Sequence, residues 1–328
     1  MNTIAAPFPW FGGKSGACEQ VWAAFGAVDN YVEPFSGSAA MLLGAPDGKR
    51  VETINDADGF VANFWRAIAA DPEAVAHHAD WPCNESDLFA RHSWLVRQSP
   101  SLTEQLHADP GWFDAKIAGW WCWGACNWIG SGWCSGKGPW IHDGERLVNA
   151  RKLPHLGNAG RGINRQLQHL GDAGQGRRAF ISAWFARLHE RLRNVRVACG
   201  DWSRVVKDSV TTRHGLTGVF LDPPYTKGAM DYSAGGVGTD LPLQVQAWCA
   251  ENGHNPLLRI VLCGHAGEHD ALLAHGWHLR TWTARKGYAL ADEAVKNSKS
   301  ETLWCSPHCI QSKTQAGLFN EQPALLFA

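Results

Sequence analysis

Several features that would assign the protein to a membrane or secreted class are missing from the sequence. No apolar run is long enough to span a bilayer, and the N-terminus, Met1-Asn2-Thr3-Ile4, is not a basic segment followed by an apolar one. The ten cysteines are scattered, and none belongs to a Cys-x-x-Cys pair. We therefore expect a cytoplasmic protein with reduced cysteines and no signal peptide.

Zinc-site spacing is also missing. Two loose groups of cysteine and histidine match none of the paired patterns that zinc sites use. We interpret these cysteines as small buried hydrophobic residues and predict no metal. The two groups are Cys122, Cys126, Cys134 and His142, and Cys305, His308 and Cys309.

Two glycine-rich phosphate-binding fingerprints are incomplete. Gly12-Gly13-Lys14-Ser15 imitates the end of a nucleoside triphosphate P-loop, but the glycine that this loop needs five positions before its second one is Phe8 here. The turn 35–38 lacks the three spaced glycines of the dinucleotide fingerprint. The first segment is better interpreted as a tight turn over a ligand, with Trp10 as a wall and Lys14 as a cation, or as an ordinary N-terminal loop.

Length and composition indicate a soluble globular protein. The chain has 328 residues, a formal net charge of -1 and 45% apolar residues, which suggests one large domain or a domain with a sizeable insertion. The 18 tryptophans are unusual and mark one region as compositionally distinct. The bunched tryptophans are Trp112, Trp120, Trp121, Trp123, Trp128, Trp133 and Trp140.

The strongest chemical signal is Asp222-Pro223-Pro224-Tyr225, which follows the apolar run 218–221. This pattern predicts a buried strand that ends at a rigid turn, where open α/β sheets bind their ligands. An amino group on a heteroaromatic base is a poor nucleophile. The Asp222 carboxylate and the Pro223 carbonyl can accept hydrogen bonds from it, while Tyr225 stacks on the extruded base. The alternative is a structural Pro-Pro turn with a surface aromatic.

Two strand ends near the N-terminus are candidate cofactor sites. A strand from Tyr31 runs into the turn Glu33-Pro34-Phe35-Ser36-Gly37-Ser38, where Gly37 permits close backbone approach and Glu33 can face a cationic group. A second strand, 51–54, ends at Asn55-Asp56, and an acid at this place usually holds a ribose hydroxyl pair. Asp58 is predicted to be the N-cap of the helix that follows.

Strand–helix alternation stops at about residue 71 and resumes at about residue 195. Helical patterns occupy 94–105, 112–121 and 179–192, and a basic excess follows the tryptophan-glycine stretch 127–140. Such a local excess indicates a nucleic-acid contact, although for any single arginine a solvated surface is the better explanation. The candidate DNA-binding residues are Lys137, Arg151, Lys152, Arg161, Arg165, Arg177 and Arg178.

The C-terminal third again alternates. The strand 195–199 ends near Asp201, which can accept from the adenine amino group of a cofactor, and Trp202, which packs on that adenine or belongs to the core. A helix is expected beyond Trp202. A glycine-rich loop 226–238 follows the Asp222 strand, and then come a helix 241–251, a strand 258–263 and a helix near 268–274. The strands 277–283 and 302–304 are expected to form a hairpin-like edge on a mostly parallel sheet.

Together these segments resemble the Dam-like DNA adenine methylase family. Phe11-Gly12-Gly13-Lys14 is similar to its N-terminal cofactor segment, 33–38 to its methionine-binding loop, and Asn55-Asp56 to its ribose acid. Asp222-Pro223-Pro224-Tyr225 is similar to its catalytic tetrapeptide, and Glu301-Thr302-Leu303-Trp304 to its closing strand. The resemblance implies a class I (Rossmann-like) methyltransferase fold, S-adenosylmethionine as cofactor, base flipping, and methyl transfer to the N6 amine of adenine in double-stranded DNA.

The resemblance also implies a domain order. We expect a catalytic domain in two parts, 1–70 and 195–305, an inserted, mainly helical DNA-recognition domain at 71–194, and a tail at 306–328. The stretch 127–140 aligns to no known reader of GATC, so a relaxed or phage-type specificity is compatible with it. Two alternatives stay open, which are an amino-cytosine or RNA methyltransferase and a non-catalytic DNA-binding protein.

The tail contains one further pattern. Gln315-Ala316-Gly317-Leu318-Phe319 resembles the short peptide by which bacterial proteins bind the replication sliding clamp. A Leu-Phe pair on a polar tail needs a partner or must fold back on the domain, and five-residue motifs also arise by chance. We expect a monomer.

Overall fold

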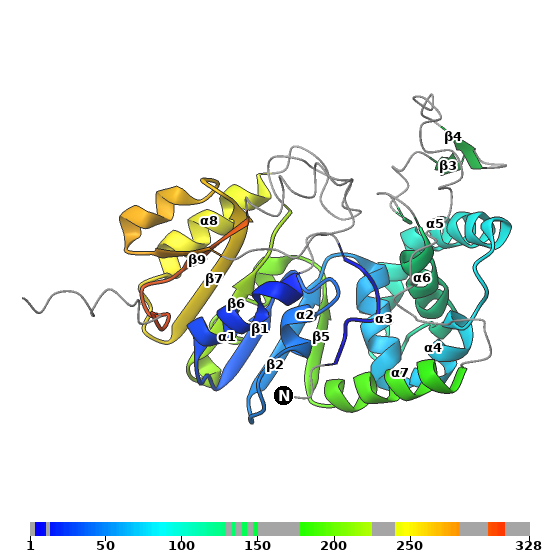
Figure 1. Ribbon diagram of the computed structural model, residues 1–328, viewed down its shortest axis with the longest axis horizontal. Helices are drawn as coiled ribbons and strands as arrows, with labels where there is room; N and C mark the ends of the chain where they lie inside the picture. Colours follow the sequence, from blue (N-terminus) through cyan, green and yellow to red (C-terminus); the bar gives the residue numbers. More distant parts are fainter. Residues whose placement is uncertain are drawn as a thin grey trace, which may run out of the picture.

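The computed structural model shows an α/β protein with a helical layer at one end of a central sheet (Figure 1). The residues it describes are 4–10, 14–128, 133–134, 140–142, 147–149, 178–224, 240–281 and 301–311. The expected loop 226–238, the clamp-like peptide with Gln315, Leu318 and Phe319, and most of the tail lie outside these residues. No helix among those described is long and apolar enough to cross a membrane.

The sheet has seven strands in the order β5-β2-β1-β6-β7-β9-β8. Its parallel part pairs β1 with β2 and β6, β2 with β5, and β6 with β7. The strand β9 is antiparallel to both β7 and β8. This arrangement confirms the predicted parallel sheet with an antiparallel edge. The strands are β1 (Asn30–Glu33), β2 (Val51–Asp56), β5 (Val195–Cys199), β6 (Thr217–Leu221), β7 (Leu258–His265), β8 (His278–Thr281) and β9 (Glu301–Cys305).

Both faces of the sheet are buried, which explains the uninterrupted apolar runs 219–221 in β6 and 260–263 in β7. In β6, Phe220 packs into one hydrophobic cluster, and its neighbours Val219 and Leu221 pack into another on the opposite face. The first cluster includes residues of α1 (Cys18–Phe25), α2 (Ala40–Leu43) and α3 (Gly59–Ala70). The second includes residues of α8 (Leu241–Asn252) and of the 3-10 turn η4 (Asp270–His275).

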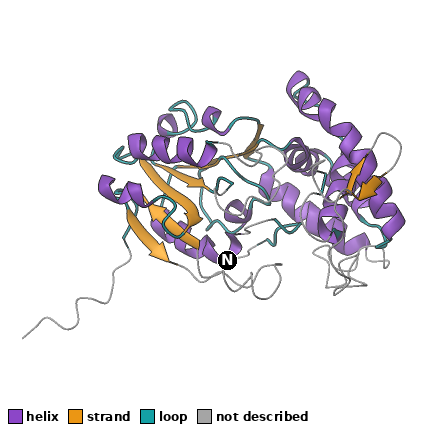
Figure 2. Ribbon diagram, turned by 90° about the horizontal axis from the view of Figure 1, so that it is seen from above, coloured by secondary structure: helices purple, strands orange, loops and turns teal. Residues whose placement is uncertain are grey.

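Among the described residues, four helices follow α3 before the chain returns to the sheet at β5. They are α4 (Pro72–Ala79), α5 (Glu85–Ala108), α6 (Ala115–Asn127) and α7 (Arg178–Leu192), and a small antiparallel pair, β3 (Trp140–His142) and β4 (Leu147–Asn149), lies between α6 and α7 in sequence. Figure 2 shows this helical group beside the sheet rather than over it. Helix α3 contacts α4, α5, α6 and α7 as well as β2 and β5, so it connects the two parts.

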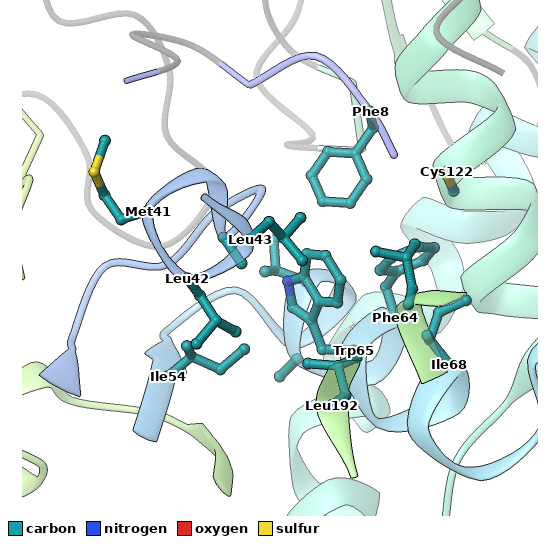
Figure 3. Close-up of a cluster of buried hydrophobic side chains, with 14 of the residues drawn as sticks. Phe8, Met41, Leu42, Leu43, Ile54, Phe64, Trp65, Ile68, Cys122 and Leu192 are labelled. Carbon is teal, nitrogen blue, oxygen red and sulfur yellow. The ribbon is translucent and has the colours of Figure 1, made fainter. Parts of the chain in front are cut away.

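Side chains from distant segments meet at this junction (Figure 3). Phe8 of the N-terminal segment, Trp65 of α3 and Leu192 of α7 belong to one buried cluster with residues of α2 and α6. Phe8 contacts the rings of Phe64, Trp65 and Trp121 with centroid distances of 5.2, 6.0 and 4.8 Å. The N-terminal segment is therefore fixed against the helical layer just before it reaches Trp10.

The helix ends have clear local causes. Asp58 is the N-cap of α3, as predicted, because its Oδ1 accepts a hydrogen bond from the Phe60 N–H at 2.8 Å. Helix α5 is longer than the predicted 94–105 because Asn84 caps it early, and it continues through Pro100. The helices expected after Trp202 and near 268–274 are instead the short 3-10 turns η2 (Trp202–Arg204) and η4.

Candidate active site

The strand order places two candidate segments at one point of the sheet. From β1 the chain builds β2 and β5 toward one edge, and it then returns to β6 on the other side of β1. Ligands of open α/β sheets bind outside the carboxyl ends of the strands where the order reverses in this way. The turn after β1, which begins at Glu33, and the turn after β6, which begins at Asp222, therefore meet at this switch point (Figure 1).

The turn after β1 is held by a few specific contacts. Gly37 has a φ of 45°, its N–H donates to Asp56 Oδ2 at 2.9 Å, and its carbonyl accepts from Trp65 Nε1 at 3.0 Å. Ala39, directly before α2, has a φ of 52°, a backbone conformation that residues other than glycine rarely adopt. The constrained backbone leaves the small residues of the turn facing the carboxyl ends of the strands.

Asn55 ties three strand ends together. Its Nδ2 donates to the carbonyls of Pro34, after β1, and Gly200, after β5, each at 3.0 Å. The backbone carbonyl of Asn55 accepts a hydrogen bond from the N–H of Ser36 at 2.9 Å. The asparagine is 1% exposed. It thereby fixes the distance between the two turns that flank β2.

Glu33 is a buried carboxyl group with neutral partners. It is 2% exposed, and the hydroxyl of Tyr31 donates to its Oε2 at 3.0 Å. Among the residues that the structure describes, no cationic side chain forms an ion pair with it. Burial raises the pKa of Glu33 from 4.5 to about 8. A ligand that brings a positive charge here would find a carboxyl group without a cationic partner.

Asp56 lies at the end of β2 and accepts backbone hydrogen bonds on both oxygens. The N–H of Gly37 donates to its Oδ2, and the N–H of Asp58 donates to its Oδ1, each at 2.9 Å. Burial, helped by the nearby Asp58, raises the pKa of Asp56 to about 7. Each carboxylate oxygen has a second lone pair, so the group can still accept from ligand hydroxyls.

A pocket connects these turns with the end of β6. Predicted residues from both turns line it, together with side chains that sequence reasoning did not single out. At its base the Lys14 ammonium, which is 4% exposed, lies 3.4 Å from Asp222 Oδ1 and 3.4 Å from Glu301 Oε1. Lys14 was predicted to contact the cofactor and is seen here against the candidate catalytic carboxylate. The lining residues are Trp10, Lys14, Glu33, Phe35, Ser36, Ser38, Ala40, Met41, Phe220 and Asp222.

Asp201 and Trp202 stand further along the same edge, at the end of β5. Asp201 caps η2, because its Oδ1 accepts from the N–H and the hydroxyl of Ser203 at 2.9 and 2.5 Å. Trp202 is 7% exposed and stacks on Phe35 at a centroid distance of 6.1 Å. Phe35 thus links this tryptophan to the pocket, and the assignment of both residues to the adenine of a cofactor stays a prediction.

Several predicted residues lie outside the described part of the chain. They are Gly12, Gly13 and Tyr225 of the pocket segments and Lys137, Arg151, Lys152, Arg161, Arg165 and Arg177 of the basic segment. Arg178, at the start of α7, is described. Its side chain is 50% exposed and lies 3.3 Å from Glu73. Pro34 and Pro223 are buried, and Pro224 is partly exposed.

Sequence reasoning missed the roles of Asn55 and Glu301 within this site. Glu301 was noted only as the first residue of a closing strand, although a lone acidic residue that begins an apolar strand is a usable signal. Asn55 gave no such signal, because asparagine at a strand end is ordinary turn chemistry. In the described ranges, no group of three or more His, Cys, Asp or Glu side chains is placed to hold a metal ion. Cys122 and Cys126 are buried and point at the Pro7 carbonyl.

Comparison with known proteins agrees with this geometry over the first part of the chain. A model of the D12 class of N6 adenine-specific DNA methyltransferases matches residues 10–96. The matched span contains Trp10, Lys14, the turn 33–38 and Asp56, and it ends before Asp222. No curated protein matches the chain. The family match confirms the predicted resemblance, and the seven-stranded sheet is consistent with the class I methyltransferase fold.

Proposed function

We propose that this chain, whose residues 10–96 match the D12 class of N6 adenine-specific DNA methyltransferases, transfers the methyl group of S-adenosylmethionine to the N6 amine of an adenine in duplex DNA. One observation carries the proposal. The Asp222 carboxylate, at the end of β6, and the buried Glu33 carboxyl, at the end of β1, line the same pocket at the switch point of the sheet.

The residues of this pocket fit S-adenosylmethionine by their chemistry. Glu33 offers a buried carboxyl to which no described residue brings a cationic partner, and this suits a positively charged ligand. Asp56 retains free lone pairs at the place where a ribose hydroxyl pair is usually held. Gly37 has no side chain, and the Trp10 indole, which also lines the pocket, occupies the place where its Cβ would lie. When bound, this cofactor supplies an electrophilic methyl group on a positively charged sulfur.

The protein's contribution to the chemistry centres on Asp222. Its carboxylate accepts a hydrogen bond from the adenine amine, which increases electron density on a nitrogen whose lone pair is otherwise delocalised into the ring. As that nitrogen forms its bond to the methyl carbon, the carbon–sulfur bond breaks and its electron pair stays on sulfur. The proton that the nitrogen loses passes to Asp222 and then to water. No covalent enzyme intermediate is needed.

The target base must leave the duplex to reach this pocket, because the amine is inaccessible inside a stacked helix. We assign Tyr225 to stacking on the extruded base, and Pro223 to a second hydrogen bond through its carbonyl. The basic residues of the segment 137–178 are assigned to the DNA backbone, where neutralising phosphates gives affinity without sequence choice. The exposed Arg178 exchanges its surface pairing with Glu73 for a phosphate at little cost.

The decisive experiment is to incubate the full-length protein with S-adenosylmethionine and unmethylated duplex DNA, digest the DNA to nucleosides and identify the methylated one by mass. N6-methyladenine at one short recurring sequence would support both the reaction and a specific reader. N6-methyladenine at most adenines would support the reaction with relaxed specificity.

Three results would count against the proposal. N4-methylcytosine would assign the same carboxylate chemistry to another base, and methylation of RNA alone would exclude duplex DNA as the substrate. No methylation, together with no binding of S-adenosylmethionine in calorimetry, would leave a DNA-binding protein without the reaction. The Asp222→Ala variant is the matched control, since a product made by a contaminating enzyme persists in it.

A further inference from the structure

One lysine that lines the pocket lies between two carboxylates. Lys14 lies in the 3-10 turn η1 (Lys14–Ala17), Asp222 follows β6, and Glu301 begins β9. The Lys14 Nζ is 3.4 Å from one oxygen of each acid. The side chains are 4%, 18% and 12% exposed for Lys14, Asp222 and Glu301 respectively, so water screens these charges poorly.

The group contains one ammonium and two carboxylates, and this balance of charge affects how well Asp222 accepts a hydrogen bond. A buried lysine paired with Asp222 alone would occupy lone pairs of the carboxylate and stabilise its negative charge. Both effects would make Asp222 a weaker base. A second carboxylate on the same ammonium counteracts both effects. Burial and the nearby Asp222 raise the pKa of Glu301, while Lys14 lowers it, so the acids act on each other as well as on the cation.

We infer that Glu301 is a positioning residue which, by sharing Lys14, holds Asp222 in place and keeps it a strong acceptor for the substrate amine. This inference rests on the proposed methyl transfer. Glu301 does not touch the reacting atoms in this arrangement, because it acts through Lys14.

Two other titratable groups lie near these acids. Glu33, from β1, contributes a repulsive interaction with Asp222. His265 is the cross-strand neighbour of Glu301 on β7. Neither bridges the two acids, whereas the Lys14 ammonium lies within 4 Å of both. Lys14 and Glu301 are therefore the groups whose removal changes the charge at Asp222 in opposite directions.

The test is the pH dependence of kcat/KM for DNA. The enzyme is saturated with S-adenosylmethionine, so that every variant carries the bound, positively charged cofactor. Glu301→Gln removes a negative charge and keeps Lys14 beside Asp222. We expect kcat to fall by about tenfold to a hundredfold and the KM for the cofactor to change by less than about threefold. The acid limb of the kcat/KM profile, where activity rises with pH, should move to lower pH. Lys14→Met leaves two facing carboxylates, so the acid limb should move to higher pH.

Two further variants separate positioning from a general loss of structure. In Glu301→Asp the charge remains, so the acid limb should keep its wild-type position even if kcat falls. In the double variant Lys14→Met, Glu301→Gln the limb should lie between those of the single variants, with non-additive effects on kcat. If Glu301→Gln fails to fold, the opposite shift for Lys14→Met and the unshifted limb for Glu301→Asp still test the inference.

The outcomes are distinguishable from those of the proposed function. A wild-type protein that methylates no adenine contradicts the proposed function itself. An active wild type whose Glu301→Gln variant keeps its kcat and its acid limb contradicts the inference about Glu301 alone. Limb shifts in the same direction for Lys14→Met and Glu301→Gln also overturn it, because charge sharing requires opposite signs.

Discussion

Trp10 lies directly across Gly37 in the turn after β1. A Cβ added to Gly37 would lie 2.2 Å from Nε1 of the Trp10 indole, well inside any real contact. The glycine also has a φ of 45°, in the left-handed region that side chains disfavour. The N-terminal segment and the turn are therefore closely packed. The position of the Trp10 ring restricts residue 37 to glycine.

Gly37→Ala should weaken S-adenosylmethionine binding by more than about tenfold and lower the free energy of unfolding by roughly 1–3 kcal/mol. The clash with Trp10 forces either the ring or the turn to move, and the turn also holds Asp56 through the Gly37 N–H. Isothermal calorimetry and denaturant unfolding measure the two effects. In the double variant Trp10→Ala, Gly37→Ala the stability should recover in part. Unchanged affinity in Gly37→Ala would show that the turn does not approach the cofactor.

Cofactor binding should release a proton from Glu33. The folded-state pKa of about 8 lies above the ordinary 4.5, so without ligand the carboxyl is protonated below about pH 8. A cationic ligand favours the ionised form, so its affinity should rise with pH up to about 8 and then level off, and the Glu33 proton alone contributes at most about tenfold per pH unit. Calorimetry between pH 6 and 9 in buffers of different ionisation enthalpy measures both the slope and the proton.

Two variants assign that slope. Glu33→Gln cannot ionise, so its affinity should be weaker and should lose most of the pH dependence. Burial raises the pKa of Asp56 to about 7. Asp56→Asn should therefore remove only the part of the affinity increase that levels off near pH 7. A wild-type affinity that is flat over this range would contradict a cationic partner for Glu33.

The strands and the two turns of the site were predictable from the sequence because they depend on local chemistry. A short apolar run that stops at Asp222-Pro223 favours a buried strand that ends at a turn, and an acid after the strand 51–54 follows the usual βαβ pattern. Each turn was predicted at a strand end, but the adjacency of β1 and β6, which brings both turns to one pocket, came from the folded sheet.

The contacts of Lys14 could not be predicted in the same way. Its partners Asp222 and Glu301 are remote in sequence, and Glu301 reaches Lys14 only because β9 inserts antiparallel beside β7. Likewise, Trp202 was expected near a cofactor, but whether it packs on Phe35 depends on the tertiary arrangement. Local patterns located the carboxylates, whereas the cation that joins them required the folded chain.

Asp222→Asn should lower kcat by more than about a hundredfold while changing the Kd for S-adenosylmethionine by less than about fivefold. The amide keeps the shape of the side chain but replaces a charged acceptor with a weaker one, and it cannot take the amine's proton. Single-turnover methylation and cofactor calorimetry measure the two quantities. A variant with near-wild-type kcat would exclude the proposed role of Asp222, and a large loss of cofactor affinity would place this carboxylate on the cofactor instead.

Arg91 should be a major determinant of stability in the helical layer. Its guanidinium is 4.3, 5.0 and 4.9 Å from the ring centroids of Trp123, Trp81 and Trp120, and the residue is 6% exposed. Burial lowers its pKa to about 10, although the nearby Asp87 opposes the shift. Within the described part of the chain its Nη1 has no hydrogen-bond partner, so the three indoles offset much of its lost hydration.

Arg91→Ala removes this contact and leaves a cavity, so the free energy of unfolding should fall by about 2–4 kcal/mol. Arg97→Ala, an exposed position on the same helix, should change it by less than about 0.5 kcal/mol. Arg91→Met keeps most of the packing and removes the buried charge, so it should lose less than half of what the alanine variant loses. Urea unfolding of the three variants measures these differences. Equal losses in Arg91→Ala and Arg97→Ala would mean that the tryptophans pack without the guanidinium, and a methionine variant as unstable as the alanine one would show that the cation itself stabilises the cluster.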